Sequence, residues 1–232
     1  MRAAVQNLEL YVNYIRGRKG LEIGGPSSLF QTILPAYQTI KSLDGVNFAT
    51  HTIWEPTLLP GEGRFVYGYR QGTQYLGEAT ALPFEDHTYD IVLCSHCLEH
   101  SANPLQCIEE TKRVLSPSGC AIYVLPWKEG TFDHNRSVTS WEHLLDDYKN
   151  HTLEGDLTHL PEILRLHDIT RDPGAGTFEQ FTKRSLDNAS NRALHQHVFD
   201  EDLMRRSFEH FGFKVVCFDL VAPFHEIILV TL

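Results

Sequence analysis

Apolar segments of strand length alternate with segments of helical periodicity over the first 126 residues, and no other feature of the chain constrains its fold as strongly. Strands are predicted at 20–25, 38–45, 74–79, 89–96 and 119–126, and helices at 3–16, 26–34 and 104–115. An alternation of this kind implies a parallel sheet with helices on both faces. The continuous apolar run at 89–96 is typical of a strand buried on both faces.

Residues 200–232 are expected to complete this sheet. Asp200 is placed to cap a helix over 201–211, and Gly212 to end it. Two further strands are predicted at 213–220 and 225–232. The fold class is therefore α/β, with a doubly wound, Rossmann-like sheet of seven strands.

A polar segment, 127–199, separates the fifth strand from the closing helix. It is rich in His, Asp, Arg and Asn, and nine of the 13 histidines of the chain follow residue 131. The segment is too short and too polar to form an independent core. We interpret it as a His-rich lid insertion over a substrate site.

The charge balance argues against two classes of partner. The chain has 20 Lys and Arg against 30 Asp and Glu, so the net charge of -10 predicts neither nucleic-acid nor membrane binding.

The sequence has no apolar run of the roughly 18 residues that a membrane span requires, and its first residues lack a signal-peptide core. Its five cysteines form an odd set without a second pair to complete a zinc site, so we expect reduced, packed thiols. These features together predict a cytoplasmic protein.

The first two predicted strands end in residues suited to a nucleoside. Ligands of open α/β sheets bind beyond the carboxyl ends of the strands. Glu22 precedes Gly24 and Gly25, whose backbone can approach a ligand closely. Asp44 follows about twenty residues later and can accept hydrogen bonds from two ribose hydroxyls. The pattern indicates a site for an adenosine-type cofactor, with a simple tight turn as the alternative.

The following segments carry a more specific pattern. The sequence GEATALPFEDHTYDIVLCSHCLEH at 77–100, followed by RVLSPSG at 113–119, resembles the class I S-adenosylmethionine-dependent methyltransferases, in particular the methyltransferase type 11-like group. The resemblance extends over 18–126 and implies an antiparallel final strand and S-adenosylmethionine as the cofactor. The stretch from Gly24 to Ser27 departs from the G-x-G-x-G that is usual in this family.

The resemblance also implies where the cofactor lies. It places Glu22, Gly24 and Gly25 around the methionine part, Asp44 at the ribose, Glu78 and Ala79 at the adenine, and Ser95 and His96 near the methionine end. Tyr11 and Tyr14 on the first helix are expected to cover the cofactor, with ordinary packing as the alternative.

Methyl transfer requires a nucleophile aligned behind the sulfonium methyl group, and an alcohol acceptor also benefits from a base. His134, just beyond the fifth strand, is the predicted base, and Asp133 is the carboxylate that orients it. The alternative is a loop histidine that satisfies backbone groups.

Two other histidine pairs suggest a metal site as a further alternative. His195 and His197 in an extended stretch would point to one face, a spacing that suits two imidazole ligands. His159 and Glu162 would share a face of a helix. Structural polar contacts are the favoured interpretation, so no metal is expected.

We therefore expect a single methyltransferase domain over 1–232. It comprises a cofactor-binding half at 1–126, the substrate-binding lid insertion at 127–199, and the closing helix and strands at 200–232. The expected reaction is O-methylation of a small-molecule or carbohydrate-like acceptor, and a homodimer is left open. The alternatives are a non-catalytic binding module with this fold and a metal-dependent enzyme that uses the His-rich insertion.

Overall fold

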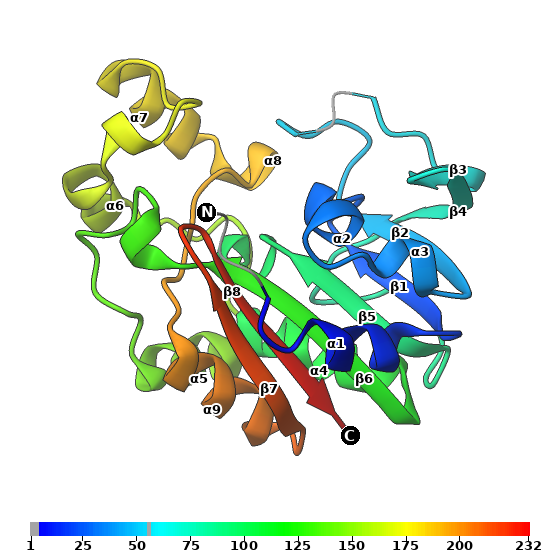
Figure 1. Ribbon diagram of the computed structural model, residues 1–232. Helices are drawn as coiled ribbons and strands as arrows, with labels where there is room; N and C mark the ends of the chain where they lie inside the picture. The colour runs from blue at the N-terminus through cyan, green and yellow to red at the C-terminus, as the bar shows by residue number, and fades with distance from the viewer. Residues whose placement is uncertain (1–4, 55–56) are drawn as a thin grey trace.

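An eight-stranded sheet forms the centre of the molecule (Figure 1). The computed structural model describes residues 5–54 and 57–232, and in this part of the chain the strand order is β3-β4-β2-β1-β5-β6-β8-β7. The strands are β1 (Lys19–Ile23), β2 (Ser42–Asn47), β3 (Gly61–Tyr67), β4 (Arg70–Leu76), β5 (Tyr89–Ser95), β6 (Leu115–Pro126), β7 (Lys214–Val221) and β8 (His225–Thr231). The helices are α1 (Leu8–Ile15), α2 (Ser28–Thr32), α3 (Ala36–Thr39), α4 (Pro104–Val114), α5 (Trp141–Asn150), α6 (Leu160–Leu166), α7 (Phe178–Leu186), α8 (Asn188–Asn191) and α9 (Glu201–His210). Residues 3 and 4 of the first predicted helix lie outside the described residues.

The sheet combines a parallel centre with antiparallel edges. β4, β2, β1, β5 and β6 pair in parallel, whereas β8 runs antiparallel to both β6 and β7. The doubly wound fold and its antiparallel final strand are therefore confirmed. The predicted count of seven strands is wrong, because β3 adds an edge strand antiparallel to β4. Gly68, at a φ of +61°, lies in the turn of this hairpin.

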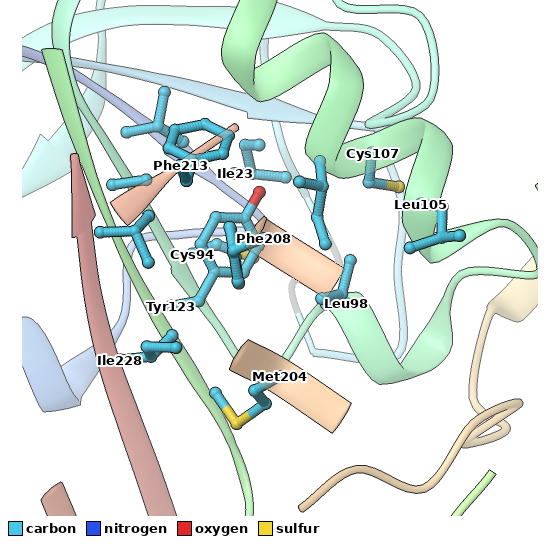
Figure 2. Close-up of a cluster of buried hydrophobic side chains, with 14 of the residues drawn as sticks. Ile23, Cys94, Leu98, Leu105, Cys107, Tyr123, Met204, Phe208, Phe213 and Ile228 are labelled. Carbon is cyan, nitrogen blue, oxygen red and sulfur yellow. The ribbon is translucent and has the colours of Figure 1, made fainter. Parts of the chain in front are cut away.

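Apolar side chains cover both faces of the sheet. On one face α1, α2 and α3 contribute Tyr11, Phe30 and Tyr37 to a buried cluster. On the other face α4 and α9 pack, and Figure 2 shows Phe208 close to Tyr123 of β6, at a ring separation of 5.0 Å. The three-layer arrangement leaves only the strand ends open for a ligand.

Side-chain caps fix the starts of the two helices on this second face. Asn103 accepts a hydrogen bond from the backbone N–H of Gln106 at 3.1 Å, and Asp200 accepts one from Leu203 at 2.9 Å. Each cap satisfies a backbone donor that the first turn of a helix leaves unpaired. Both predicted helix starts are confirmed.

The second strand is displaced from its predicted position. α3 occupies 36–39, where the strand was expected to begin, and β2 runs on to Asn47. Asp44 consequently lies in the interior of the strand, and Asn47 occupies its carboxyl end. This shift changes which side chain of β2 can reach a ligand.

The insertion, residues 127–199, contains α5 to α8. Leu144 of α5 packs in the core of the sheet's second face, whereas the rest of the insertion has its own small apolar cluster, formed by Leu160, Ile163, Ala175, Phe181 and Leu194. Arg136, which is 2% exposed, holds its two ends together. The guanidinium donates to Asp133 Oδ1 at 3.0 Å and to the carbonyl oxygens of His195 and Gln196 at 2.7 and 3.1 Å. Among the described residues, the structure contains no helix that is both long and apolar enough to cross a membrane.

Candidate functional site

A first cavity, of about 320 Å³, lies at the carboxyl ends of β1, β2, β4 and β5. Gly24 follows β1, Asn47 ends β2, Glu78 follows β4 and His96 follows β5, and all four line the cavity. Its volume is within the range of small-molecule sites, and its place is the one where open α/β sheets bind ligands. Ala79 and Ser95 also line it, so five of the predicted cofactor residues meet here: Gly24, Glu78, Ala79, Ser95 and His96.

The turn after β1 requires glycine at both positions. Gly24 has a φ of +75°, and a Cβ there would lie 3.0 Å from Cys97 Sγ. A Cβ on Gly25 would lie 2.2 Å from the carboxyl carbon of Glu22. The left-handed backbone and the close approach therefore exclude larger residues from this turn.

The side chain of Glu22 holds the same turn in place through hydrogen bonds. Its Oε1 accepts a hydrogen bond from the backbone N–H of Ser27 at 2.9 Å, and Tyr37 donates its hydroxyl to Oε2 at 2.7 Å. The side chain is completely buried, and burial raises the pKa of Glu22 to about 8. Glu22 and Gly25 do not line the cavity, so they shape the turn and leave the contact surface to Gly24 and Ser27.

At the end of β2 the structure brings Asn47, and not Asp44, to the cavity. Asp44 accepts hydrogen bonds from the backbone N–H of Thr73 at 2.9 Å and from the hydroxyl of Tyr89 at 3.2 Å. These bonds hold its carboxylate between β2 and its neighbours, away from the cavity lining. Asn47 lines the cavity and donates through Nδ2 to the carbonyl oxygen of Gly25 at 3.0 Å.

An arginine of the insertion closes the far side of the first cavity. Arg192 forms ion pairs of 2.9 Å with both Glu78 and Glu154, and its guanidinium lies 5.0 Å from the ring centre of Phe48. Desolvation raises the pKa of Glu78, and the charge of Arg192 opposes this effect. The insertion thus contributes directly to the wall that faces Glu78 and Ala79.

The two tyrosines of α1 lie elsewhere. Tyr11 is completely buried and donates its hydroxyl to the carbonyl oxygen of Ile227 at 3.2 Å. Tyr14 packs against the same apolar layer. Neither residue lines the first cavity, so the packing alternative describes their positions.

A second cavity, of about 520 Å³, adjoins the first and shares Trp54, His96 and His100 with it. His195 of the insertion and His225 of β8 add two more imidazoles to its lining. The remaining wall includes polar and aromatic side chains of the insertion, namely Thr131, Phe132, Asp172 and Arg184. The two cavities therefore meet at a boundary that is lined by histidine side chains.

A buried carboxylate lies at this boundary. Glu99, which is 0% exposed, has one oxygen 3.6 Å from His96 Nδ1 and 3.9 Å from the Nε2 atoms of His100 and His195. Neither of its oxygens has a hydrogen-bond partner within the described residues. Burial opposes its ionisation, but the surrounding imidazoles outweigh this effect and lower the pKa of Glu99. Three imidazoles thus face one fixed negative charge.

His96 occupies a strained position between the two cavities. Its φ is +51°, a left-handed conformation that is uncommon for a residue other than glycine. Its backbone N–H donates to the carbonyl oxygen of Val124 at 2.8 Å, and its Nε2 lies 2.8 Å from His225 Nδ1. Strain of this kind concentrates at functional sites and persists only where the surroundings impose it.

Comparisons with known proteins agree with this arrangement. Residues 67–123 match the family described as methyltransferase domain. A structure of an S-adenosylmethionine-dependent methyltransferase from Mesorhizobium loti is similar at 11% identity, with a TM-score of 0.56, and the match covers 97% of this chain and 95% of that one. The chain has the class I methyltransferase fold. The resemblance seen in the sequence is thereby confirmed, and the family match and the fold support S-adenosylmethionine as the cofactor.

Two other structures share this methyltransferase fold. One, from Methanosarcina mazei, is described as a member of the S-adenosylmethionine-dependent methyltransferases; it is 17% identical with a TM-score of 0.53, and the match covers 96% of each chain. The other, trans-methyltransferase CalH in complex with SAH, is 12% identical with a TM-score of 0.50, and the match covers 97% of this chain but 54% of that one. No curated protein matches this chain by sequence.

The predicted pair of His134 and Asp133 is not formed in the structure. His134 Nε2 lies 2.9 Å from Asp168, and His134 lines neither cavity. Asp133 instead contacts His195, with 2.5 Å between Oδ2 and Nδ1. Burial opposes ionisation of Asp133, yet His195 and Arg136 lower its pKa to about 2. The carboxylate was identified by the sequence, but its imidazole partner comes from the other end of the insertion.

The predicted metal pair is also divided. His195 faces Glu99 and the second cavity, whereas His197 lies on the other side of the segment, 3.0 Å from Asp147. The segment between α8 and α9 is not a regular strand, so alternation does not put the two imidazoles on one face. Glu162 lies 3.7 Å from Arg136 and does not join His159.

Proposed function

We propose that this methyltransferase transfers the methyl group of S-adenosylmethionine to a hydroxyl group of a small, polar, carbohydrate-like acceptor. One observation carries the proposal: the cavity at the strand ends and the His-lined second cavity share Trp54, His96 and His100. Transfer between two bound molecules requires that their reacting atoms meet at such a boundary. A binding module would need only the first cavity.

The residues of the first cavity suit the three parts of the cofactor. The Asn47 side chain at the end of β2 takes the place that we had expected for Asp44, and its amide can hydrogen-bond a ribose hydroxyl. Glu78 and Ala79 face the adenine end, and Gly24 with Ser95 faces the methionine end. Bound S-adenosylmethionine supplies a sulfonium methyl group that a nucleophile attacks as the carbon–sulfur bond breaks.

The chain itself must position the acceptor and remove its proton. His96 Nε2 and His225 Nδ1 are 2.8 Å apart, so one of the two rings holds the proton between them. With the shared proton on His225 Nδ1, the lone pair of His225 Nε2 is free to accept the hydroxyl proton as the oxygen–carbon bond forms. The Glu99 carboxylate, 3.6 Å from His96 Nδ1, stabilises the positive charge that the pair of rings then shares. We therefore assign the base to His96 with His225, in place of the His134 suggested by the sequence.

The lining of the second cavity supports a polyhydroxylated acceptor. Its four imidazoles can each donate or accept, and hydroxyl groups do both. Arg184 and Asp172, which are paired with each other at 2.8 Å, add a polar wall. The insertion supplies this ion pair and His195, which supports its interpretation as a substrate-binding lid.

Calorimetry and a turnover assay test this proposal together. S-adenosylmethionine should bind the purified protein, and a panel of small sugars and polyols should include a compound that causes S-adenosylhomocysteine to form. His96→Gln should lower turnover by roughly 10²- to 10⁴-fold with little change in cofactor affinity. His134→Gln is the matched control and should retain turnover within about tenfold.

Cofactor binding without turnover on any acceptor would favour the binding module. A large loss in His134→Gln with little loss in His96→Gln would return the base to the residue that the sequence suggested. Loss of activity on treatment with a chelator, with cofactor binding and the unfolding temperature unchanged, would favour the metal-dependent alternative.

A further inference from the structure

Four side chains of the chain converge at a point that neither cavity includes. His143 and Asp147 are separated by one turn of α5, His159 immediately precedes α6, and His197 lies in the segment before α9. One nitrogen or oxygen atom from each of the four lies within 4.8 Å of all the others. Asp147 and His197 are buried, and the other two are half-buried.

Three of the six distances between the ligand atoms of this cluster are close to those around a tetrahedral ion. His143 Nε2 lies 2.8 Å from His159 Nε2 and 3.2 Å from Asp147 Oδ2, which is 3.0 Å from His197 Nε2. Zinc bonds to nitrogen and oxygen are about 2.0–2.2 Å long, so two ligands at a tetrahedral angle lie about 3.3 Å apart. These three contacts need to open by a few tenths of an ångström to admit the ion, and the other three pairs of ligand atoms lie within 4.8 Å of one another.

The hydrogen-bond roles of His197 point to a cation in the same place. Its Nδ1 lies 3.0 Å from the carbonyl oxygen of Ser101, which can only accept, so Nδ1 carries the proton. In the neutral ring, Nε2 then presents a lone pair to the Asp147 carboxylate, which also only accepts. A proton or a metal ion must lie between them.

Hydrogen bonds from outside the cluster hold two of the four ligands, His197 and Asp147, with their ligand atoms directed at its centre. The contact from His197 Nδ1 to a backbone carbonyl is the usual outer contact of a metal-bound imidazole. The second oxygen of Asp147 accepts a hydrogen bond from the Thr152 hydroxyl at 3.1 Å, which leaves Oδ2 directed at the cluster. Both buried ligands are thus fixed before any ion binds.

We propose that His143, Asp147, His159 and His197 bind one zinc ion that stabilises the insertion. Three imidazoles and one carboxylate give four protein ligands, which is the number found in structural zinc sites and leaves no open position for a substrate. The ion joins α5, the start of α6 and the segment before α9, around an insertion whose own apolar cluster is small. The proposal is independent of methyl transfer and replaces the pair of His195 and His197 considered from the sequence.

Elemental analysis of untagged protein, purified without metal-affinity chromatography, tests the site. We expect about one zinc per chain after dialysis, and less than about 0.2 in His143→Gln and in His159→Gln. His151→Asn is the matched control, because His151 is an exposed histidine at the end of α5 with a φ of +51°, which Asn tolerates. It should retain the full zinc content.

Chelated wild-type protein provides a second measurement that does not depend on any variant. Adding Co²⁺ should give the intense visible absorption of a tetrahedral ion, and Zn²⁺ should bleach it and raise the unfolding temperature. The proposal is overturned if the wild-type protein neither retains nor takes up an ion, if the cobalt spectrum is octahedral, or if both glutamine variants keep their zinc. Cofactor affinity, measured in the same samples, reports separately on the proposed methyltransferase function.

Discussion

Replacing the buried acid beneath the glycine turn should change how the stability of the protein depends on pH. Burial raises the pKa of Glu22 from 4.5 to about 8, so between these values the folded protein holds a proton that the unfolded chain has released. The free energy of unfolding therefore falls as pH rises, by up to 1.36 kcal/mol per pH unit for this one proton. From about pH 5 to about pH 7.5 the loss amounts to about 3 kcal/mol. Glu22→Gln, which remains neutral, should lose this dependence.

The substitution should also preserve the local hydrogen bonds. The amide oxygen of Gln can accept from the backbone N–H of Ser27 and from the hydroxyl of Tyr37, as Glu22 Oε1 does at 2.9 and 3.0 Å. Glu22→Gln should thus be more stable than the wild type near neutral pH, and its advantage should shrink toward pH 5.

Urea unfolding at several pH values measures this difference directly, from the midpoint and slope at each pH. Glu226 provides a second case, because burial also raises its pKa to about 8, and Glu226→Gln should remove a similar share of the pH dependence. Glu62→Gln, at an exposed position of β3, is the control and should follow the wild type. If Glu22→Gln showed the same pH slope as the wild type, Glu22 would be ionised in the folded protein and the argument from burial would be refuted.

Three further predictions concern the first cavity. Asn47→Ala should weaken S-adenosylmethionine binding by about 1 kcal/mol in calorimetry, whereas Asp44→Ala should mainly lower the free energy of unfolding; the opposite pattern would return the ribose contact to Asp44. Gly24→Ala should lower the free energy of unfolding by about 1–2 kcal/mol in urea and also weaken cofactor binding, since φ at this position is +75°; an unchanged unfolding midpoint would contradict the argument from backbone strain. Arg192→Gln breaks two ion pairs across the cavity, so the cofactor should dissociate faster in stopped-flow measurements, and an unchanged rate would show that the arginine does not limit release.

The sequence predicts the parts of the fold that depend on local pattern. The buried run of β5 and the caps at Asn103 and Asp200 are readable because their signals lie within a few neighbouring residues. β3 was missed because GEGRFVY is rich in glycine and charge, and its pairing with β4 is decided by the edge of the sheet. The end of β2 was misplaced because DG suggests a turn, whereas GVN continues the strand.

The same distinction, between features set by local sequence and features set by the fold, applies to the residues of the candidate site. The strand-end residues Gly24, Glu78, Ser95 and His96 could be found from the sequence, because the topology of the sheet brings the ends of its parallel strands together. The partner of Asp133 could not, because His195 is 62 residues away and returns only through the path of the insertion. Glu99 was missed although His96 and His100 are its neighbours in the sequence, because the burial of its carboxylate and the approach of His195 depend on the fold.

The buried guanidinium of Arg136 divides the molecule into two parts that can vary separately. Because it ties residues 133–136 to residues 195–197, the path between them starts and finishes at one fixed neck. Loops closed at their base tolerate changes in length and sequence at small entropic cost. Replacement of residues 160–186, which include Asp172 and Arg184, would therefore alter the wall of the second cavity, while α5, packed in the core of the sheet, and Arg192, in the wall of the first cavity, stayed in place. Under the proposed function, such an exchange would change the acceptor while the lining of the first cavity was kept.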